Sequence, residues 1–261
     1  MTTIVHTTDL DADDGGAFEH AVAIARAAGA ELVSLHANPG RATGTAPLPA
    51  ASAVLRAWGA DPAAVAFNAR EHDCCDDAVD TVLTVLQQLA PDLVVAATHR
   101  RGALARFFGG SKAEAIAHNI GSPTLLMPAD ARGFVAAADG AIELPRVVVP
   151  IGDAVAAIAA IRAAAWSADL CGAQVVEFVL LHVGAPLQLD IAALTERAGW
   201  SVRRLDLQDV GIEAAIIEQC ATAQLVVMAT RGHDSVGDVL LGSHTDRVLH
   251  HCRCPLLSIA V

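Results

Sequence analysis

The sequence predicts an α/β protein of two tandem doubly wound domains, each with a mostly parallel five-stranded sheet and helices on both faces. Short, almost continuously apolar runs alternate along the chain with Ala-rich segments of helical periodicity. This alternation is typical of parallel strands buried between two layers of helices. The same succession of elements occurs twice, and right-handed crossovers within each copy give a doubly wound sheet.

In the first copy, five β-rich runs predict strands at 3–8, 31–37, 64–69, 92–98 and 123–128. The segments between them predict helices at 15–28, 50–58, 76–89 and 111–119. Gly29 ends the first helix, because glycine readily adopts the left-handed conformation that follows a helix. Asp73 is placed to cap the third helix, and Pro91 stops that helix.

The second copy repeats this order. Its predicted strands are 146–151, 177–183, 201–207, 224–230 and 255–261. Its predicted helices are 155–168, 191–198, 211–222 and one that follows Ser243. Between the copies, the segment 129–145 has few strongly apolar clusters. We therefore expect a first domain at 1–130, a linker at 131–144 and a second domain at 145–261.

The two copies match at a constant offset. Three pairs of segments, a strand, a loop and another strand, share an offset of 132 residues: 92–98 with 224–230, 110–111 with 242–243, and 122–126 with 254–258. His36 and His182, at matching strand ends, differ by 146. The difference indicates an insertion of about fourteen residues in the first copy, in the Gly- and Pro-containing stretch NPGRATGTAPLPA, which is typical of a loop.

Composition and charge exclude some function classes. Aromatic residues make up 3% of the chain and there is no Tyr, which argues against a protein that stacks nucleic-acid bases. The formal net charge of −12 would repel nucleic acid. The N-terminal sequence shows no targeting segment and no apolar run reaches membrane-spanning length, so we expect a cytoplasmic protein without a membrane partner. In that compartment the six Cys are expected as free thiols.

The loop after the strand 224–230 carries the features of a phosphate site. Ligands of doubly wound sheets bind at the carboxyl ends of the strands, where this loop begins. Gly232 and Gly242 let backbone N–H groups approach an anion, and the helix that starts at Ser243 points its N-terminus at the same place. Ser243 adds a hydroxyl group and Arg231 adds positive charge. A tight turn before a helix is the structural alternative.

The run ATRGHDSVGDVLLGSHTDRVLHHCRCPLLSI resembles the C-terminal signature of the universal stress protein family. ATP-binding members of that family carry Gly, two residues, Gly, nine residues, and then Gly-Ser or Gly-Thr. Here Ala229 takes the place of the first Gly, Gly232 is the second, and Gly242-Ser243 completes the pattern. The resemblance covers nearly the whole chain, once per copy, and implies an adenine-nucleotide α-hydrolase-like fold in each.

The resemblance implies one nucleotide site in each domain. In the second domain it implies contacts from Pro150, Gly152, Asp153, Val183, Ala229, Thr230, Arg231, Gly232, His233, Gly242, Ser243, His244 and Thr245. In the first domain it implies a degenerate site of Thr8, Asp9, Ala37, Thr98, Arg100, Gly110 and Ser111. The phosphate pattern is better preserved in the second domain.

Each copy retains a different part of the family's site. In the first copy Ala97 and Arg100 stand where the family has its first two glycines, while Gly110-Ser111 is kept. Arg100 could block the phosphate site or bind the anion by its guanidinium group. The family also has an Asp at the end of the first strand, near the adenosine, and Asp9 matches it. In the second copy Gly152 takes that position, and Asp153 follows one residue later.

Two functions follow from the resemblance. The first is a regulatory protein of the stress response that binds an adenine nucleotide, with ATP as the expected ligand, AMP as an alternative and at most slow hydrolysis. No catalytic residue can be assigned. The second is a nucleotide-free interaction scaffold that acts through dimerisation and partner binding. The family implies that the last strands, 123–128 and 255–261, pair across a two-fold axis, either in a homodimer or within one chain as a pseudo-dimer.

Three further groups of residues could carry chemistry. His250, His251, Cys252 and Cys254 form one His/Cys cluster, and residues 72–77, with vicinal thiols that could be redox-active, form another. Adjacent ligands on one short segment rarely complete a zinc site, so we expect structural roles for both clusters and no metal site. The strand-end histidines at 36 and 182 could line a cleft or play a structural part.

Overall fold

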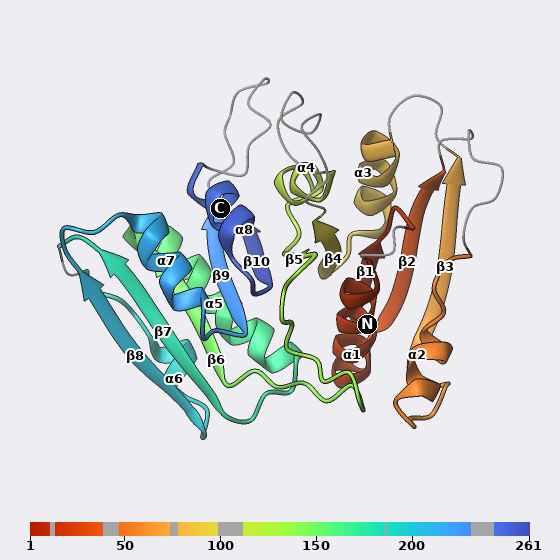
Figure 1. Ribbon diagram of the computed structural model, residues 1–261, viewed down its shortest axis with the longest axis horizontal. Coiled ribbons are helices and arrows are strands. Elements are labelled where there is room, and N and C mark those ends of the chain that lie inside the picture. The colour runs from red at the N-terminus through yellow and green to blue at the C-terminus, as the bar shows by residue number, and fades with distance from the viewer. Residues whose placement is uncertain (11–13, 39–46, 74–77, 99–111, 186, 231–242) are drawn as a thin grey trace.

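The computed structural model of the chain describes residues 1–10, 14–38, 47–73, 78–98, 112–185, 187–230 and 243–261. Strands and helices alternate along it (Figure 1). The first half comprises β1 Thr3–Thr7, α1 Gly15–Ala28, β2 Glu31–Asn38, α2 Ala51–Ala57, β3 Ala66–Asp73, α3 Ala78–Leu89, β4 Leu93–Thr98, α4 Lys112–Asn119 and β5 Thr124–Pro128. The second half comprises β6 Arg146–Ile151, α5 Ala154–Leu170, β7 Val176–Val183, α6 Ala192–Thr195, β8 Trp200–Leu207, α7 Ile212–Cys220, β9 Leu225–Thr230, α8 Ser243–His251 and β10 Leu256–Ala260.

The strands described form one ten-stranded sheet in the order β3-β2-β1-β4-β5-β10-β9-β6-β7-β8. Each half has the same internal order, in which its third strand lies at the outer edge and its fifth at the centre of the whole sheet. Within each half all paired strands are parallel. In each half the chain crosses from the outer edge back to the far side of its first strand, which makes the sheet doubly wound. The predicted fold class is confirmed.

The two half-sheets join through their last strands. β5 and β10 are antiparallel, with Leu125 opposite Leu257 and Leu126 opposite Leu256. These residues are buried, so the joint lies in the interior of the protein. Of the two pairings that the sequence leaves open for the last strands, the structure shows the one within a single chain.

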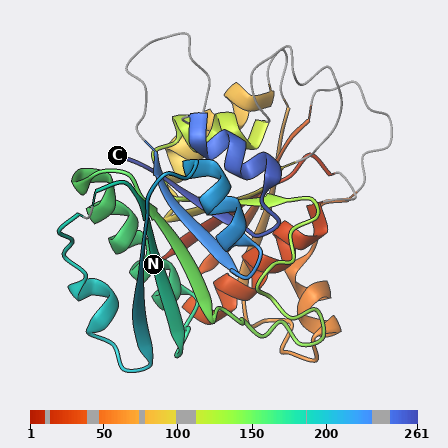
Figure 2. The same cartoon turned by 60° about the vertical axis from the view of Figure 1, so that its left-hand side comes forward.

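Helices cover both faces of the sheet. On one face α1, α2, α5 and α6 pack into a single apolar core that continues from one half into the other. On the other face α3 and α4 cover the first half, and α7 and α8 cover the second, where they lie next to each other (Figure 2). Neighbouring strand residues serve opposite faces, as Val94 and Val95 do, because side chains alternate along a strand. In the parts of the chain described, no helix is both long and apolar enough to cross a membrane.

Asp73 is the last residue of β3, and α3 is described from Ala78 onward. The cap predicted at Asp73 depends on residues 74–77, which lie outside the described residues. The strand extends beyond the predicted run because its ladder with β2 continues to the pair of Asn38 and Asp73. The amide of Asn38 also donates a hydrogen bond to Glu71 at 2.9 Å. The Cys74, Cys75, Asp76 and Asp77 part of the predicted cluster lies outside the described residues.

The segment predicted as a linker packs against the first half. Phe134 is buried, and its ring meets that of His20 edge-on at 4.6 Å between centroids. Gly140 lies against Trp58, and its carbonyl oxygen accepts a hydrogen bond from the Arg26 guanidinium at 2.7 Å. This segment therefore adds apolar contacts to the first half.

Gly140→Ala should lower the free energy of unfolding by about 3 kcal/mol. Gly140 has a φ of +66°, and a Cβ there would lie 2.3 Å from the ring of Trp58. Gly59→Ala is the matched control, because Gly59 has a φ of +67° but no atom within 4 Å of its Cβ position. The control should cost only the backbone strain of about 1–2 kcal/mol. Urea unfolding followed by circular dichroism measures both, and equal losses would contradict the clash with Trp58.

Candidate functional site

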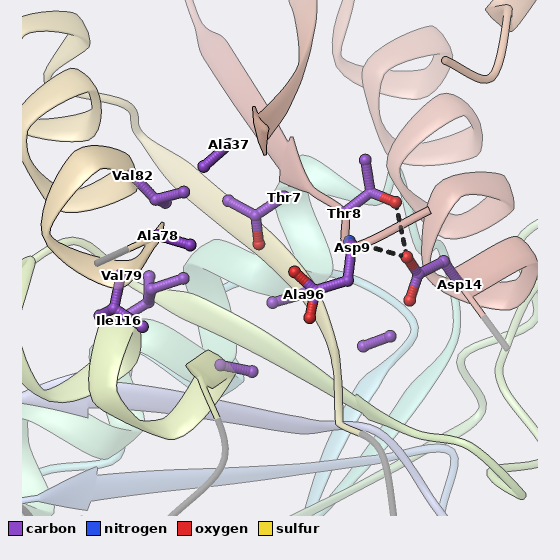
Figure 3. Close-up of a pocket in the computed structure, with 12 residues that line it drawn as sticks. Thr7, Thr8, Asp9, Asp14, Ala37, Ala78, Val79, Val82, Ala96 and Ile116 are labelled. Carbon is purple, nitrogen blue, oxygen red and sulfur yellow. Dashed lines mark hydrogen bonds between the residues drawn. The ribbon is translucent and has the colours of Figure 1, made fainter. Parts of the chain in front are cut away.

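An open cavity lies in the first half, at the carboxyl ends of β1 and β4 (Figure 3). β1 and β4 are neighbours there, and the chain leaves them in opposite directions across the sheet. This is the switch point at which doubly wound folds bind ligands. The lining comes from both strands, β2, α3, α4 and the turn after β1, and consists of Thr7, Thr8, Asp9, Asp14, Ala37, Ala78, Val79, Val82, Ala96, Ala97, Ala113 and Ile116.

A buried carboxylate fixes the turn that carries Asp9. The hydroxyl group of Thr8 donates a hydrogen bond to Asp14 Oδ2 at 2.5 Å, and the backbone N–H of Asp9 donates to the same oxygen at 3.1 Å. The N–H of Leu10 in turn donates to Thr8 Oγ1 at 2.9 Å, and Leu10 has a φ of 61°. Three hydrogen bonds thus hold this turn in one conformation at the mouth of the cavity.

The cavity combines two polar side chains with a small apolar wall. Figure 3 shows the hydroxyl group of Thr7 and the carboxylate of Asp9 pointing into the same space. Val79 and Val82 of α3 and Ile116 of α4 border that space on the helical side. A carboxylate accepts hydrogen bonds from hydroxyl groups, and the apolar wall suits a flat ring. The arrangement is suited to a ligand with both parts.

Histidines at the ends of β2 and β7 hold the first strand of each half. His36 Nδ1 lies 2.8 Å from the carbonyl oxygen of Thr8. His182 Nδ1 lies 2.9 Å from that of Ile151, and its Nε2 lies 2.8 Å from that of Ala185. Both imidazoles are buried and lie against backbone carbonyl oxygens, so these contacts are structural. Because Thr8 and Ile151 occupy matching places, Asp9 and the residue after Ile151 correspond, as the sequence comparison predicts.

The second half differs at this position. Gly152 provides no carboxylate where the first half has Asp9. The carboxylate of Asp153 accepts hydrogen bonds from the N–H groups of Val155 and Ala156, at 2.9 and 3.1 Å, and so caps α5. Pro150 is half-buried within β6, and Val183 ends β7. Among the described residues of this half, Gly152 therefore leaves the place that matches Asp9 without a carboxylate. The carboxylate of Asp153, one residue later, already caps α5.

The phosphate loops of both predicted sites lie outside the described residues: Arg100, Gly110 and Ser111 in the first half, and Arg231, Gly232, His233 and Gly242 in the second. Ser243 and His244 open α8, and Thr245 is buried in its first turn. Thr98 and Thr230 are buried at the ends of β4 and β9, and Thr230 donates a hydrogen bond to the carbonyl oxygen of Ile259 at 3.1 Å. Ala97 lines the cavity, and Ala229 is half-buried at the matching place of β9.

Of the residues that the resemblance implies for the first site, Thr8, Asp9 and Ala37 line the cavity. Thr7 and Asp14 also line it and were not predicted. Asp14 immediately precedes α1, a position at which Asp often caps a helix, but no side-chain capping bond forms there. In the structure its carboxylate instead accepts hydrogen bonds from the turn before it. Thr7 is the last residue of β1. Only the order of the strands in the sheet shows that this end of β1 borders the cavity.

A family comparison agrees with this architecture. The model of the "Universal stress protein family" matches residues 1–128 and 203–259. Universal stress proteins of Mycobacterium tuberculosis and Mycobacterium bovis are each 28% identical over 187 residues, which cover 64% of this chain and 61% of the relative. The match thus spans less than two thirds of the length of these curated relatives.

Solved structures show the same fold over the whole chain. A universal stress protein from Archaeoglobus fulgidus superposes with a TM-score of 0.71 at 16% identity, covering 99% of this chain and 96% of its own. A putative universal stress protein from Pseudomonas aeruginosa gives a TM-score of 0.68 at 15% identity, covering 100% and 93%. With the family model matched in both halves of the sheet, this chain belongs to the universal stress protein family.

Proposed function

We propose that this protein is a regulatory protein of the stress response that binds an adenine nucleotide, with ATP as the first candidate and AMP as the second. The observation that carries the proposal is the cavity at the switch point of the first half, where the turn bonded to Asp14 presents Asp9. The Asp9 carboxylate would accept hydrogen bonds from the ribose hydroxyl groups. The apolar wall formed by Val79, Val82 and Ile116 would contact the base.

The two halves support different parts of such a site. The first half presents the carboxylate and the cavity for the nucleoside. The second half has the better phosphate pattern in sequence, Gly232 and Gly242-Ser243, ahead of α8. Helix N-termini favour bound anions, so Ser243 at the start of α8 is suited to a phosphate contact. We therefore treat the second half as the other candidate site, and we expect any hydrolysis to be slow.

The direct test uses the freshly purified protein. The protein is denatured, the supernatant is assayed for adenine nucleotides, and the nucleotide-free protein is titrated with ATP and with AMP by calorimetry. We expect carried nucleotide, bound ATP, or both. Detection of neither would reject nucleotide binding and favour the scaffold function, in which the protein acts through association with partners.

Asp9→Asn should weaken nucleotide binding by the first half roughly 10- to 100-fold, because a hydrogen bond to a charged group contributes about 1.5–3 kcal/mol. Asp61→Asn is the matched control, since Asp61 does not line the cavity and Asn can keep the hydrogen bond that Asp61 accepts from the N–H of Ala63 at 2.9 Å. Calorimetry with ATP measures both variants. Equal affinities for Asp9→Asn and the unaltered protein would show that the Asp9 carboxylate does not contact the nucleotide.

A second pair of variants tests the second half. Gly242→Val should abolish binding there, because a branched side chain would stand where backbone is expected to meet phosphate. Gly110→Val is the equivalent change in the first half, and we expect it to reduce total binding less. The number of ATP molecules bound per chain is measured by calorimetry for each variant. Equal losses from both would contradict the ranking of the two phosphate loops.

A further inference from the structure

Three buried cysteine thiols converge in the second half. Cys220 is the last residue of α7, Cys252 directly follows α8, and Cys254 precedes β10. Their sulfur atoms all lie within 4.8 Å of one another, and those of Cys252 and Cys254 are 3.3 Å apart. Each of the three residues is at most 2% exposed. Cys220 is far from the other two in sequence, so only the fold brings the third sulfur into the group.

Packing of the two helices explains why the thiols meet. α7 and α8 lie side by side on one face of the sheet (Figure 2), and Arg247 of α8 forms an ion pair with Glu213 of α7 at 2.9 Å. The N–H of Cys252 donates to the carbonyl oxygen of Val248 at 2.7 Å, which continues the helical turn and places the thiol on the inner side. His250 and His251 are exposed, so the cysteines separate from the histidines with which they cluster in sequence.

One arginine of the predicted linker joins the two segments that carry the thiols. The backbone N–H of Arg132 donates to the carbonyl oxygen of Arg253 at 3.0 Å, between Cys252 and Cys254. The guanidinium group of Arg132 donates to the carbonyl oxygen of Ala221, the residue after Cys220. Arg132 therefore joins the two segments, and its guanidinium group places positive charge beside the thiols. This charge would partly compensate the negative charge of the thiols when they become thiolates.

The spacing of the sulfur atoms matches a single metal ion. Metal–thiolate bonds are about 2.3 Å long, so two sulfurs on one ion are at most about 4.6 Å apart and close to 4 Å apart in a trigonal site. The observed separations, from 3.3 Å to at most 4.8 Å, require shifts of well under 1 Å to reach these values. Cys171, the other buried cysteine in the part of the chain described, belongs to no such group.

The number and kind of ligands select the ion. Structural zinc sites almost always have four ligands, and in the described residues no fourth His, Cys, Asp or Glu joins the three thiols. Sites made only of thiolates prefer soft ions, Cu(I) among them. We propose that Cys220, Cys252 and Cys254 form a three-thiolate site for Cu(I). On binding, the thiols release their protons to the buffer and the oxidation state of the metal does not change.

Such an ion would tie the end of α7 to the segment that links α8 to β10. Both segments belong to the apolar core on that face of the second half. An ion that binds only the folded chain stabilises it by mass action. The proposal is independent of the nucleotide-binding function, because none of the three cysteines lines the cavity of the first half or belongs to the predicted site of the second half.

The test uses the full chain with Cys74→Ser and Cys75→Ser, which removes the two cysteines outside the described residues. The reduced protein is titrated without oxygen with Cu(I) supplied as its bathocuproine disulfonate complex, and with Zn²⁺ in parallel. We expect one Cu(I) per chain and three sulfur neighbours in X-ray absorption. Loss of a residue that only hydrogen-bonds to a metal ligand lowers metal affinity roughly 10- to 100-fold. Cys220 is itself a ligand, so Cys220→Ala should lower the affinity for Cu(I) by more than that. Cys171→Ala should leave it unchanged.

A second measurement avoids dependence on a folded Cys220 variant. Labelling of the same protein with iodoacetamide, read by mass spectrometry, should show that Cu(I) slows modification of Cys220, Cys252 and Cys254. Labelling of Cys171, which is also buried but belongs to no such group, should proceed at the same rate with and without metal. The proposal fails if Cu(I) does not compete with the chelator, if Cys220→Ala binds as tightly as its parent, or if only Zn²⁺ binds.

Discussion

The free energy of unfolding should fall by about 4 kcal/mol between pH 7 and pH 5, because two histidines are buried as neutral imidazoles. His6 lies in β1 and is fully buried, and His20 lies in α1 and is 5% exposed. Burial lowers the pKa of His6 to about 4, against an opposing effect of Asp14. Burial also lowers the pKa of His20 to about 4, against the hydrogen bond to the Gly16 carbonyl.

The direction of the effect follows from proton uptake by the unfolded chain. An unfolded histidine titrates near pH 6.5, so it takes up a proton well before the folded one does. The stability that each neutral imidazole contributes is therefore complete above pH 6.5 and is lost as the pH falls toward 4. At pH 5 the loss is about 2 kcal/mol per histidine. A small protein has only about 5–15 kcal/mol in total, so the fall should be easy to measure.

The surroundings of the two rings explain why protonation is unfavourable. His20 Nδ1 lies 2.7 Å from the carbonyl oxygen of Gly16, and its Nε2 accepts the N–H of Phe134 at 2.9 Å. A proton on Nε2 would replace this acceptor with a second donor facing an N–H group. His6 packs at 5.1 Å from the ring of Phe18, and its Nε2 has no hydrogen-bond partner among the described residues.

Urea unfolding at pH 7, 6 and 5 measures the effect. His20→Gln and His6→Asn should each be less stable at pH 7 but should lose about half of the pH dependence. His251→Gln, at an exposed position of α8, is the control and should keep the full dependence. If both buried variants showed the same slope as the unaltered protein, these histidines would not be the groups that titrate.

The repeat in the sequence carries geometric information about the joint between the two half-sheets. The offset of 132 maps Leu125 onto Leu257, and these two residues lie directly opposite each other in the antiparallel joint. The same offset maps Leu126 onto Ser258 and Thr124 onto Leu256, so the flanking pairs exchange with each other. A pseudo-two-fold axis therefore passes through the pair formed by Leu125 and Leu257, as in a dimer with a self-complementary interface.

The candidate site was predictable only where it depends on position along a strand. Asp9 matches the Asp that the family has at the end of its first strand, and the carboxyl end of that strand lies at the switch point. Asp14 was not predicted, because its bond with Thr8 depends on how the turn between them folds. Cys220 meets Cys252 only because α7 and α8 pack side by side, a contact between distant segments that no local spacing reveals.

Replacing both residues of the central pair, Leu125→Ala with Leu257→Ala, should bring the protein close to unfolding. Leu125 is 2% exposed and Leu257 is 1% exposed, and both belong to the core shared by the two halves. A buried Leu→Ala change costs about 2–5 kcal/mol through lost apolar burial and the cavity that remains. Two such changes amount to roughly 4–10 kcal/mol, comparable with the whole stability of a typical domain.

The coupling between Leu125 and Leu257 is the more discriminating part of this prediction. Residues directly opposite in antiparallel strands have Cβ atoms about 4.5–5.5 Å apart, so the first substitution removes atoms that the second side chain contacts. We expect a coupling energy of about 0.5–3 kcal/mol in a double-mutant cycle measured by urea unfolding. Leu125→Ala combined with Leu32→Ala is the control. Leu32 is fully buried in the same core, but β2 is separated from β5 by β1 and β4.

Neighbouring strands lie about 4.8 Å apart, and two strands separate Leu32 from Leu125, so these residues lie beyond the distance at which substitutions normally interact. The effect of Leu32→Ala should therefore add to that of Leu125→Ala within about 0.5 kcal/mol. Coupling at Leu257 without coupling at Leu32 would show that the two halves unfold as one unit through their last strands. If the changes at Leu125 and Leu257 were additive, or if unfolding separated into two transitions, each half would hold its own stability and the joint would contribute little. The cycle therefore measures how far the shared core makes two repeats behave as one protein.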